Sequence, residues 1–91
     1  MITGFKDKDV KDLFTNRTAS KRLAPYAAAA LRKLVSVDAA TTLSDLKSPG
    51  NDLKKVGGTK STWQIRIDGK YRVRFTWDGR DASDVEVGDF H

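Results

Sequence analysis

The sequence predicts an α+β domain in which N-terminal helices pack on one face of a mainly antiparallel, twisted sheet. Two apolar stripes with helical period occupy the first half of the chain, and three runs with period-two alternation fill the last third. Helices followed by a series of antiparallel strands are typical of this class and leave the second sheet face uncovered. The chain has 91 residues, 38% of them hydrophobic, which suffices for one small core and therefore for a single domain.

The N-terminal half is predicted to contain a short strand and two main helices. Residues 2–5 form the strand, and residues 6–16 form the first helix, with Asp7 as its cap. The apolar stripe of this helix consists of Val10, Leu13 and Phe14. The second helix begins near Pro25 and ends near Val37. Its stripe consists of Ala27, Ala30, Leu31, Leu34 and Val35. This stripe is too small to anchor in a membrane, so it is assigned to the core.

Shorter elements are predicted between the second helix and the main strands. Asp38 is expected to cap a short helical piece, which carries Ala39, Ala40, Leu43 and Leu46. Residues 48–51 contain Pro, Gly and Asn and are predicted to form a turn. Residues 53–56 then supply the first strand of the main sheet, and the two glycines after them form another turn.

The last third of the chain is predicted to be a three-stranded meander with two contrasting faces. The apolar face carries Trp63, Ile65, Ile67, Tyr71, Val73, Phe75, Trp77, Val85 and Val87. The uncovered face carries Gln64, Arg66, Arg72, Arg74, Glu86 and Phe90. Since three of these six side chains are arginines, the uncovered face is the first candidate for a binding site.

The strand register follows from keeping these two faces separate. A two-residue loop at Asp68 and Gly69 would place Ile65 opposite Arg72, so a bulge or an odd-length loop is required. With Ile65 opposite Val73, Arg66 faces Arg72.

In this register a symmetric second hairpin pairs Arg74 with Glu86 and leaves Gly88 opposite Arg72. Like charges directly opposite on a sheet cost roughly 0.2–1 kcal/mol. The pair formed by Arg66 and Arg72 therefore predicts an external anion, and a phosphate suits guanidinium groups. The alternative is an arginine face that is simply solvated.

The composition limits the partners and the chemistry. Seventeen Lys and Arg against twelve Asp and Glu give a net charge of +5, which favours nucleic acid, an acidic protein or an anionic membrane surface. The absence of cysteine excludes disulfides and thiolate catalysis, and one histidine disfavours a histidine-rich metal site. We expect a cytoplasmic protein, because no stretch has the features of a signal peptide or a membrane span.

The basic side chains favour RNA cleavage without a metal ion or other cofactor. The sequence has no glycine-rich phosphate loop, and its acidic residues are scattered rather than clustered as metal-dependent nucleases require. Arginine, lysine and histidine suit a reaction in which the RNA 2′-hydroxyl attacks the adjacent phosphate. Cations then stabilise the developing charge while a proton donor assists the leaving 5′-oxygen.

These residues carry a resemblance to a known family. The segments Trp63-x-Ile65-Arg66-Ile67, Tyr71-Arg72-Val73 and Val85-x-Val87-x-Asp89-Phe90-His91 resemble the HigB toxins of the RelE/ParE superfamily. Two earlier segments are similar to that family as well, namely Phe5-Lys6-Asp7-Lys8 with Leu13-Phe14, and Leu46-x-x-Pro49-Gly50-Asn51-x-Leu53. The resemblance covers residues 1–91 as a single RelE/ParE-like toxin domain.

The resemblance implies a ribosome-dependent mRNA endonuclease that belongs to a type II toxin-antitoxin system. The implied partners are a HigA-type helix-turn-helix antitoxin and the ribosome with bound mRNA, with operator DNA contacted only through the antitoxin. The implied catalytic residues are Arg72 and His91, and the register argument adds Arg66 as a phosphate contact. Lys54, Lys55, Lys60, Arg74 and Phe90 complete the expected RNA-binding set.

Two departures from the family pattern leave other functions open. The family usually has tyrosine where this chain has Phe90, and the lysine expected in a Leu-Lys-Gly turn falls on Gly57. Lys54, Lys55 and Lys60 lie near that turn as substitutes. These departures imply weak catalysis. They also leave two alternatives, a ParE-like toxin that binds DNA gyrase and a non-catalytic module that binds RNA or the ribosome.

Overall fold

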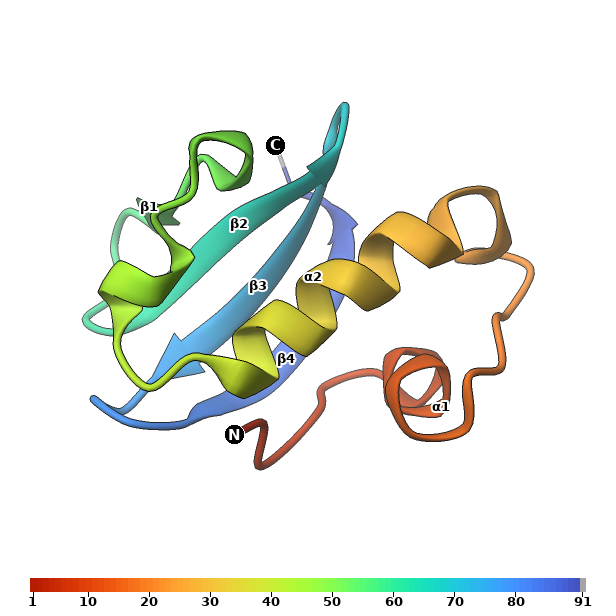
Figure 1. Cartoon of the computed structure of the whole chain (residues 1–91), viewed down its shortest axis with the longest axis horizontal. Helices are drawn as coiled ribbons and strands as arrows, with labels where there is room; N and C mark the ends of the chain where they lie inside the picture. The colour runs from red at the N-terminus through yellow and green to blue at the C-terminus, as the bar shows by residue number, and fades with distance from the viewer. Residues whose placement is uncertain (91) are drawn as a thin grey trace.

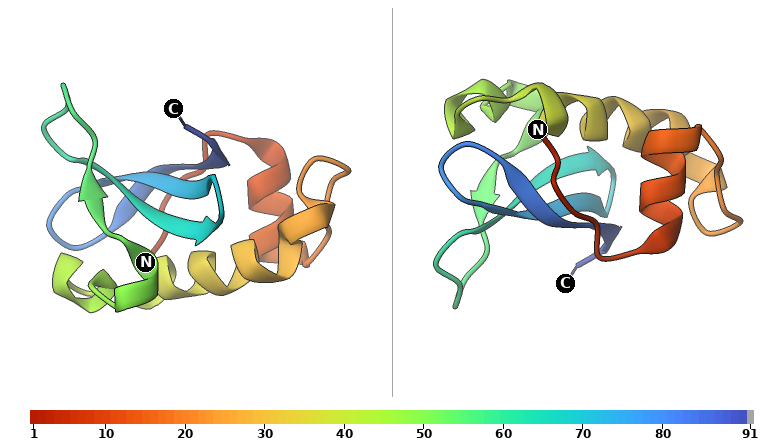
Figure 2. Two further views of the ribbon diagram at one scale, coloured as in Figure 1. Left: turned by 90° about the horizontal axis from the view of Figure 1, so that it is seen from above. Right: turned by 90° about the horizontal axis from the view of Figure 1, so that it is seen from below.

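The computed structural model describes residues 1–90, in which one helix lies along a four-stranded antiparallel sheet. The strands are β1 (Lys54–Lys55), β2 (Thr62–Asp68), β3 (Tyr71–Trp77) and β4 (Ala82–Asp89), and their order in the sheet is β1-β2-β3-β4. The main helix, α2 (Ala27–Ala39), crosses one face of the sheet, and α1 (Lys8–Asn16) lies beside β4 and α2 (Figures 1 and 2). The predicted α+β fold is confirmed.

Residues 1–90 also contain three short 3₁₀ helices, one at the expected start of the second helix, one in the predicted short helical piece and one at the predicted turn. The first, η1 (Ala24–Tyr26), contains Pro25 and leads directly into α2. The other two, η2 (Leu43–Leu46) and η3 (Pro49–Asn51), connect α2 to β1. Proline fixes its own φ near the helical value and lacks an N–H, so it suits the first turn of η1 and of η3.

The predicted strand register is confirmed. Ile65 pairs with Val73 and Arg66 pairs with Arg72, and the register shifts between Arg66 and Asp68 as the separation of the two faces requires. On the other side of β3, Arg72 faces Gly88.

A second register shift, which the sequence analysis did not predict, lies between β3 and β4. It falls after Arg74, and Asp84 on the opposite strand has a φ of 49°. Ala82 and Val85 are both fully buried although a regular strand would point them to opposite faces. An extra residue at Asp84 therefore turns both side chains toward the core, as a β-bulge does.

The core lies between α2 and the sheet. Ile65, Val73, Phe75 and Val85 are fully buried on the sheet side. On α2 the buried residues are Ala30, Leu34 and Val37, which are spaced at four and three positions and so share one helix face. The prediction of Val35 as a core residue is wrong, since it is 45% exposed. Val37 belongs to the buried stripe instead, because it follows Leu34 by three residues and therefore lies on the same face of a helix with 3.6 residues per turn.

The predicted N-terminal strand forms two isolated parallel bridges instead of a regular strand. Ile2 pairs with Ala82 and Phe5 pairs with Val85, with Thr3 N donating to Ala82 O at 2.7 Å and Lys6 N donating to Val85 O at 2.9 Å. This segment therefore covers much of the outer edge of β4. An edge strand protected in this way is less able to pair with another chain.

The two predicted helix caps differ in outcome. Asp7 occupies the N-cap position of α1 as predicted, although α1 begins at Lys8, two residues later than expected. The Asp7 carboxylate makes no capping hydrogen bond and lies 3.7 Å from Arg22 Nη2. Asp38 lies inside α2, where its carboxylate accepts a hydrogen bond from Ile2 N at 2.9 Å. The following helical turn begins with a capping box formed by Thr42 and Asp45.

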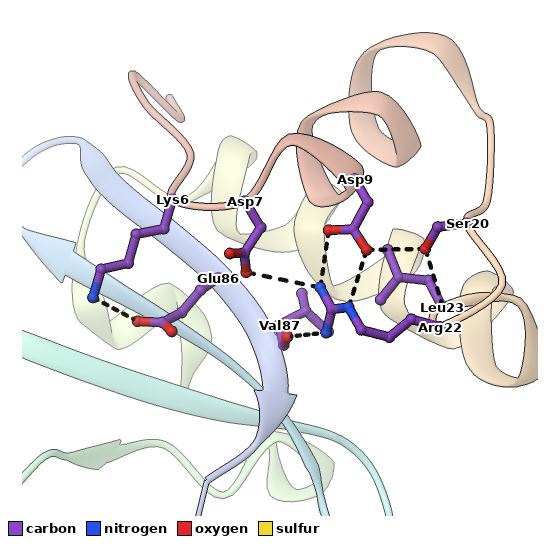
Figure 3. A network of polar contacts seen from close by, with 8 residues as sticks. All are labelled: Lys6, Asp7, Asp9, Ser20, Arg22, Leu23, Glu86 and Val87. Atoms are coloured by element: carbon purple, nitrogen blue, oxygen red, sulfur yellow. Dashed lines mark hydrogen bonds and ion pairs between the residues drawn. The ribbon is translucent and has the colours of Figure 1, made fainter.

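Arg22 joins α1 to the C-terminal part of β4 (Figure 3). Its Nε and Nη2 donate to the two oxygens of Asp9 at 3.0 and 2.9 Å, and its Nη1 donates to Val87 O at 2.7 Å. Ser20 Oγ donates to the same carboxylate at 2.9 Å. Hydrogen bonds from the Arg22 guanidinium hold the pKa of the Asp9 carboxyl below its usual range.

Asp9→Asn is expected to destabilise the fold by about 1 kcal/mol at pH 7, since it weakens a charge-assisted pair that is partly exposed. The pKa of Asp9 is lower in the folded than in the unfolded protein. This stabilisation is therefore present above about pH 4 and is lost as the pH falls through the folded value. Urea unfolding at pH 7 and at low pH measures this difference.

Asp12→Asn is the matched control, because Asp12 lies on the same helix in an exposed pair with Lys8 at 3.8 Å. It is expected to change the free energy of unfolding by only about 0.5 kcal/mol or less. Equal destabilisation by the two substitutions at pH 7, or an Asp9→Asn effect that persists unchanged at low pH, would contradict the assigned role of Asp9.

Candidate functional site

The sheet face opposite α2 presents the predicted basic residues in two rows across the strands. The paired positions Lys54, Gln64, Arg74 and Glu86 form one row, and Arg66, Arg72 and Gly88 form the next. Directly paired residues point to the same face of a sheet, so the register alone places these side chains together. Figure 2 shows that α2 covers only the other face.

Arg66 and Arg72 occupy the end of this face near the β2–β3 turn. Arg66 is exposed, and its side chain has no hydrogen bond or ion pair to any residue from 1 to 90. Arg72 Nη1 donates to Gly69 O at 2.7 Å and to Tyr71 O at 3.1 Å. Its Nε and Nη2 form no hydrogen bond within the described part of the chain. This edge of the guanidinium can accept an anion in the bidentate manner.

The expected ion pair between Arg74 and Glu86 does not form, although the two residues are paired in the sheet. Glu86 instead accepts a hydrogen bond from Lys6 Nζ at 3.2 Å, as Figure 3 shows. Arg74 Nη2 donates to Gln64 Oε1 at 3.1 Å. The N-terminal segment runs beside β4 and brings Lys6 to Glu86 from 80 residues away in sequence. A contact between residues so far apart in sequence leaves no local sequence pattern, so it could not be predicted from the sequence.

The ring of Phe90 lies beside Gly88, the residue that is paired with Arg72. A Cβ atom at position 88 would lie 3.5 Å from Phe90 Cζ. The guanidinium carbon of Arg74 lies 4.2 Å from the centroid of the same ring. Phe90 therefore belongs to the basic face as predicted, and it occupies the position opposite Arg72.

The three predicted lysines do not gather in one place. Lys54 shares the row of Gln64 and Arg74, and its Nζ lies 3.4 Å from Asp52 Oδ2. Lys55 pairs with Trp63 and thus points to the other face. Lys60 lies in the β1–β2 connection, six residues before Arg66, which corresponds to roughly 20 Å along an extended strand. Of the two lysines on β1, Lys54 is the one on the same face as the arginines.

His91, the predicted proton-transfer residue, lies outside the described residues. Within residues 1–90, no three His, Cys, Asp or Glu side chains are close enough together to hold a metal ion. An open pocket of about 600 Å³ exists elsewhere, between η3 and Trp63. Its lining consists of Lys47, Ser48, Pro49, Asp52, Leu53 and Trp63, and it includes none of the arginines.

The aromatic residues of β2 and β3 are directed away from the basic face, as the alternation predicts. Trp77 is 7% exposed, and Trp63 packs against the core cluster. Tyr71 stacks on Tyr26 with ring centroids 3.9 Å apart. Among the described residues of the basic face, Phe90 is therefore the aromatic side chain able to contact a ligand.

A comparison with known protein families identifies a family for this chain. A family model described as "RelE-like toxin of type II toxin-antitoxin system HigB" matches residues 3–91, nearly the whole chain. A search of the curated proteins found no match.

No helix among residues 1–90 has the length and apolar character needed to cross a membrane.

Proposed function

Because this chain belongs to the HigB-like family of RelE-like toxins of type II toxin-antitoxin systems, we propose that it cleaves mRNA on the ribosome. Membership of a type II system implies an antitoxin partner. The proposed antitoxin is a HigA-type helix-turn-helix protein, through which alone the toxin contacts operator DNA. The proposed place of action is the translating ribosome in the cytoplasm.

The observation that carries the proposal is the direct pairing of Arg66 with Arg72 on the uncovered face. Two like charges at paired positions destabilise a sheet unless an anion lies between them. Within residues 1–90, neither side chain forms an ion pair with a carboxylate. An RNA phosphate supplies the missing charge and matches the shape of the guanidinium group.

In the proposed reaction the 2′-hydroxyl of one nucleotide attacks the phosphorus atom that links it to the next. The P–O5′ bond breaks, which leaves a 2′,3′-cyclic phosphate and a 5′-hydroxyl. Arg66 and Arg72 stabilise the negative charge that develops on the phosphate oxygens, and Lys54 adds to the positive potential. The 2′-hydroxyl loses its proton as the new P–O bond forms, and the leaving 5′-oxygen gains a proton. His91 is the proposed group for one of these two transfers, with water as the partner in the other, an assignment that rests on the family resemblance.

Expression of the protein without its antitoxin is expected to stop growth and to create new 5′ ends within translated mRNAs. Primer extension on several transcripts before and after induction measures these ends. Co-expression of a helix-turn-helix protein encoded beside this gene should restore growth and remove the new ends.

The same experiment separates the alternative functions. Growth arrest with intact mRNA and a DNA-damage response would indicate a ParE-like toxin that acts on gyrase. Intact mRNA without a DNA-damage response would indicate a non-catalytic protein that binds RNA or the ribosome. Either outcome would contradict the proposed endonuclease.

A further inference from the structure

Arg74 lies at the centre of the basic face, yet one edge of its guanidinium is closed to a phosphate. Its Nη2 is engaged by Gln64, and its Nε is buried without an acceptor among residues 1–90. Bidentate binding of a phosphate uses two neighbouring N–H groups on one edge of the guanidinium. Since one nitrogen of the Nε–Nη2 edge is buried and the other is bonded, this edge is closed to a ligand.

The main contact of the Arg74 guanidinium is with the ring of Phe90. The distance of 4.2 Å from the guanidinium carbon to the ring centroid is well within the range of a cation–π interaction. The far edge of the same ring lies beside Gly88, where its Cζ atom would be 3.5 Å from a Cβ atom, an ordinary van der Waals distance. The contact from Arg74 on β3 therefore holds the ring beside position 88 of β4.

The ring held in this way lies beside the proposed phosphate site. Gly88 is paired with Arg72, which is paired with Arg66, so the ring and the two arginines occupy one row of the sheet. Phe90 is only partly buried, and Arg74 lies against one face of its ring. A phenyl ring without a hydroxyl interacts with single-stranded RNA chiefly by stacking on a base.

We propose that Arg74 is a positioning residue that holds the Phe90 ring as a stacking platform for a nucleobase of the RNA. The inference rests on the proposed function, because the base belongs to the strand whose phosphate Arg66 and Arg72 contact. Arg74 acts through Phe90 and not as a further phosphate ligand.

The first test measures the contact itself and does not depend on RNA. The ring current of Phe90 shifts the NMR signals of the Gly88 α-protons. Arg74→Gln should move these signals toward their positions in Phe90→Leu. Arg80→Gln is the matched control, since Arg80 is an exposed arginine in the β3–β4 turn at the other end of the sheet, and it should leave them unchanged. Unchanged Gly88 signals in a folded Arg74→Gln protein would overturn the positioning role.

The second test measures cleavage of a ribosome-bound mRNA by purified protein. Arg74→Gln and Phe90→Leu should each raise KM by about 5- to 100-fold, the range expected for one base–aromatic stack, with little change in kcat. The double variant should be no worse than the more severe single variant. Phe90→Tyr, which retains the ring, should bind like the wild type. Phe90→Leu removes the ring without altering Arg74, so the test does not depend on how well a substitution at Arg74 folds.

The alternative role, direct contact of Arg74 with a phosphate, gives different results. The two KM effects would then multiply in the double variant, and Arg74→Gln would weaken the salt dependence of RNA binding more than Arg80→Gln does. Either result would overturn the inference. A wild-type protein that cleaves no mRNA would refute the proposed function together with the nucleobase platform. The NMR result would still decide whether Arg74 holds the ring.

Discussion

Arg72→Ala is expected to abolish growth arrest and to lower kcat for ribosome-bound mRNA by about 10²–10³-fold, the usual loss when one group that stabilises an oxyanion is removed. The Nε and Nη2 groups of Arg72 form no hydrogen bond with residues 1–90, while Nη1 is bonded to the carbonyl of Gly69. The substitution therefore removes the charge that we propose stabilises the transition state. Toxicity after induction and single-turnover cleavage in vitro measure the effect.

Two further variants make this experiment specific. Arg80→Ala removes an equal charge at the other end of the sheet and is expected to leave cleavage unchanged. Arg72→Lys keeps the charge but loses the planar, two-pronged geometry, so it should recover only part of the activity. Loss of the bonds to the β2–β3 turn should cost about 1–2 kcal/mol of stability, which thermal unfolding detects separately. Full toxicity of a folded, well-expressed Arg72→Ala protein would refute the role of Arg72.

His91→Ala is expected to lower the cleavage rate by about 10²–10⁴-fold, the range typical of a general acid or base. The prediction rests on the family resemblance, since His91 lies outside the described residues. An unperturbed imidazole has a pKa near 6.5, so the wild-type rate should change with pH around that value and the variant should lose this dependence. Single-turnover cleavage measured from about pH 5.5 to about pH 8 tests both effects. This range extends roughly one pH unit or more on each side of the imidazole pKa.

Chemical rescue provides the control for this second prediction. Free imidazole added to His91→Ala should restore part of the cleavage rate if the lost group transfers a proton. It should not rescue Arg72→Ala, whose defect is electrostatic. If His91→Ala cleaves mRNA as fast as the wild type, His91 has no catalytic role, and the gyrase-directed and simple binding functions become the better hypotheses.

The sequence by itself was sufficient to predict the fold class, the strands β2 to β4 and the register of the basic face. The physical reason is that side chains alternate strictly along a strand, so a slip of one residue would bury Arg66 and expose Ile65. This constraint required the shift after Arg66 and set Arg72 opposite both Arg66 and Gly88, as the structure confirms. The family resemblance, confirmed over residues 3–91, also came from strand motifs and their spacing.

Only the tertiary structure decided which charged side chains meet. The paired positions of Arg74 and Glu86 suggested an ion pair, but the N-terminal segment along β4 brings Lys6 to Glu86. Arg74 is left with Gln64 and the Phe90 ring. Register determines which residues are neighbours on a strand pair. It does not determine which long, flexible side chain reaches a given carboxylate, because that depends on segments remote in sequence.

The helix caps and the positions of the three lysines likewise depended on the tertiary structure. Local sequence offered Asp38 as a helix cap, whereas in the fold its carboxylate binds Ile2 N and Thr42 performs the capping. Lys54, Lys55 and Lys60 are near one another in sequence, but strand alternation and the length of β2 separate two of them from the arginines. Sequence periodicity thus determined which face is basic, and long-range packing determined which of its cations have no acidic partner among residues 1–90.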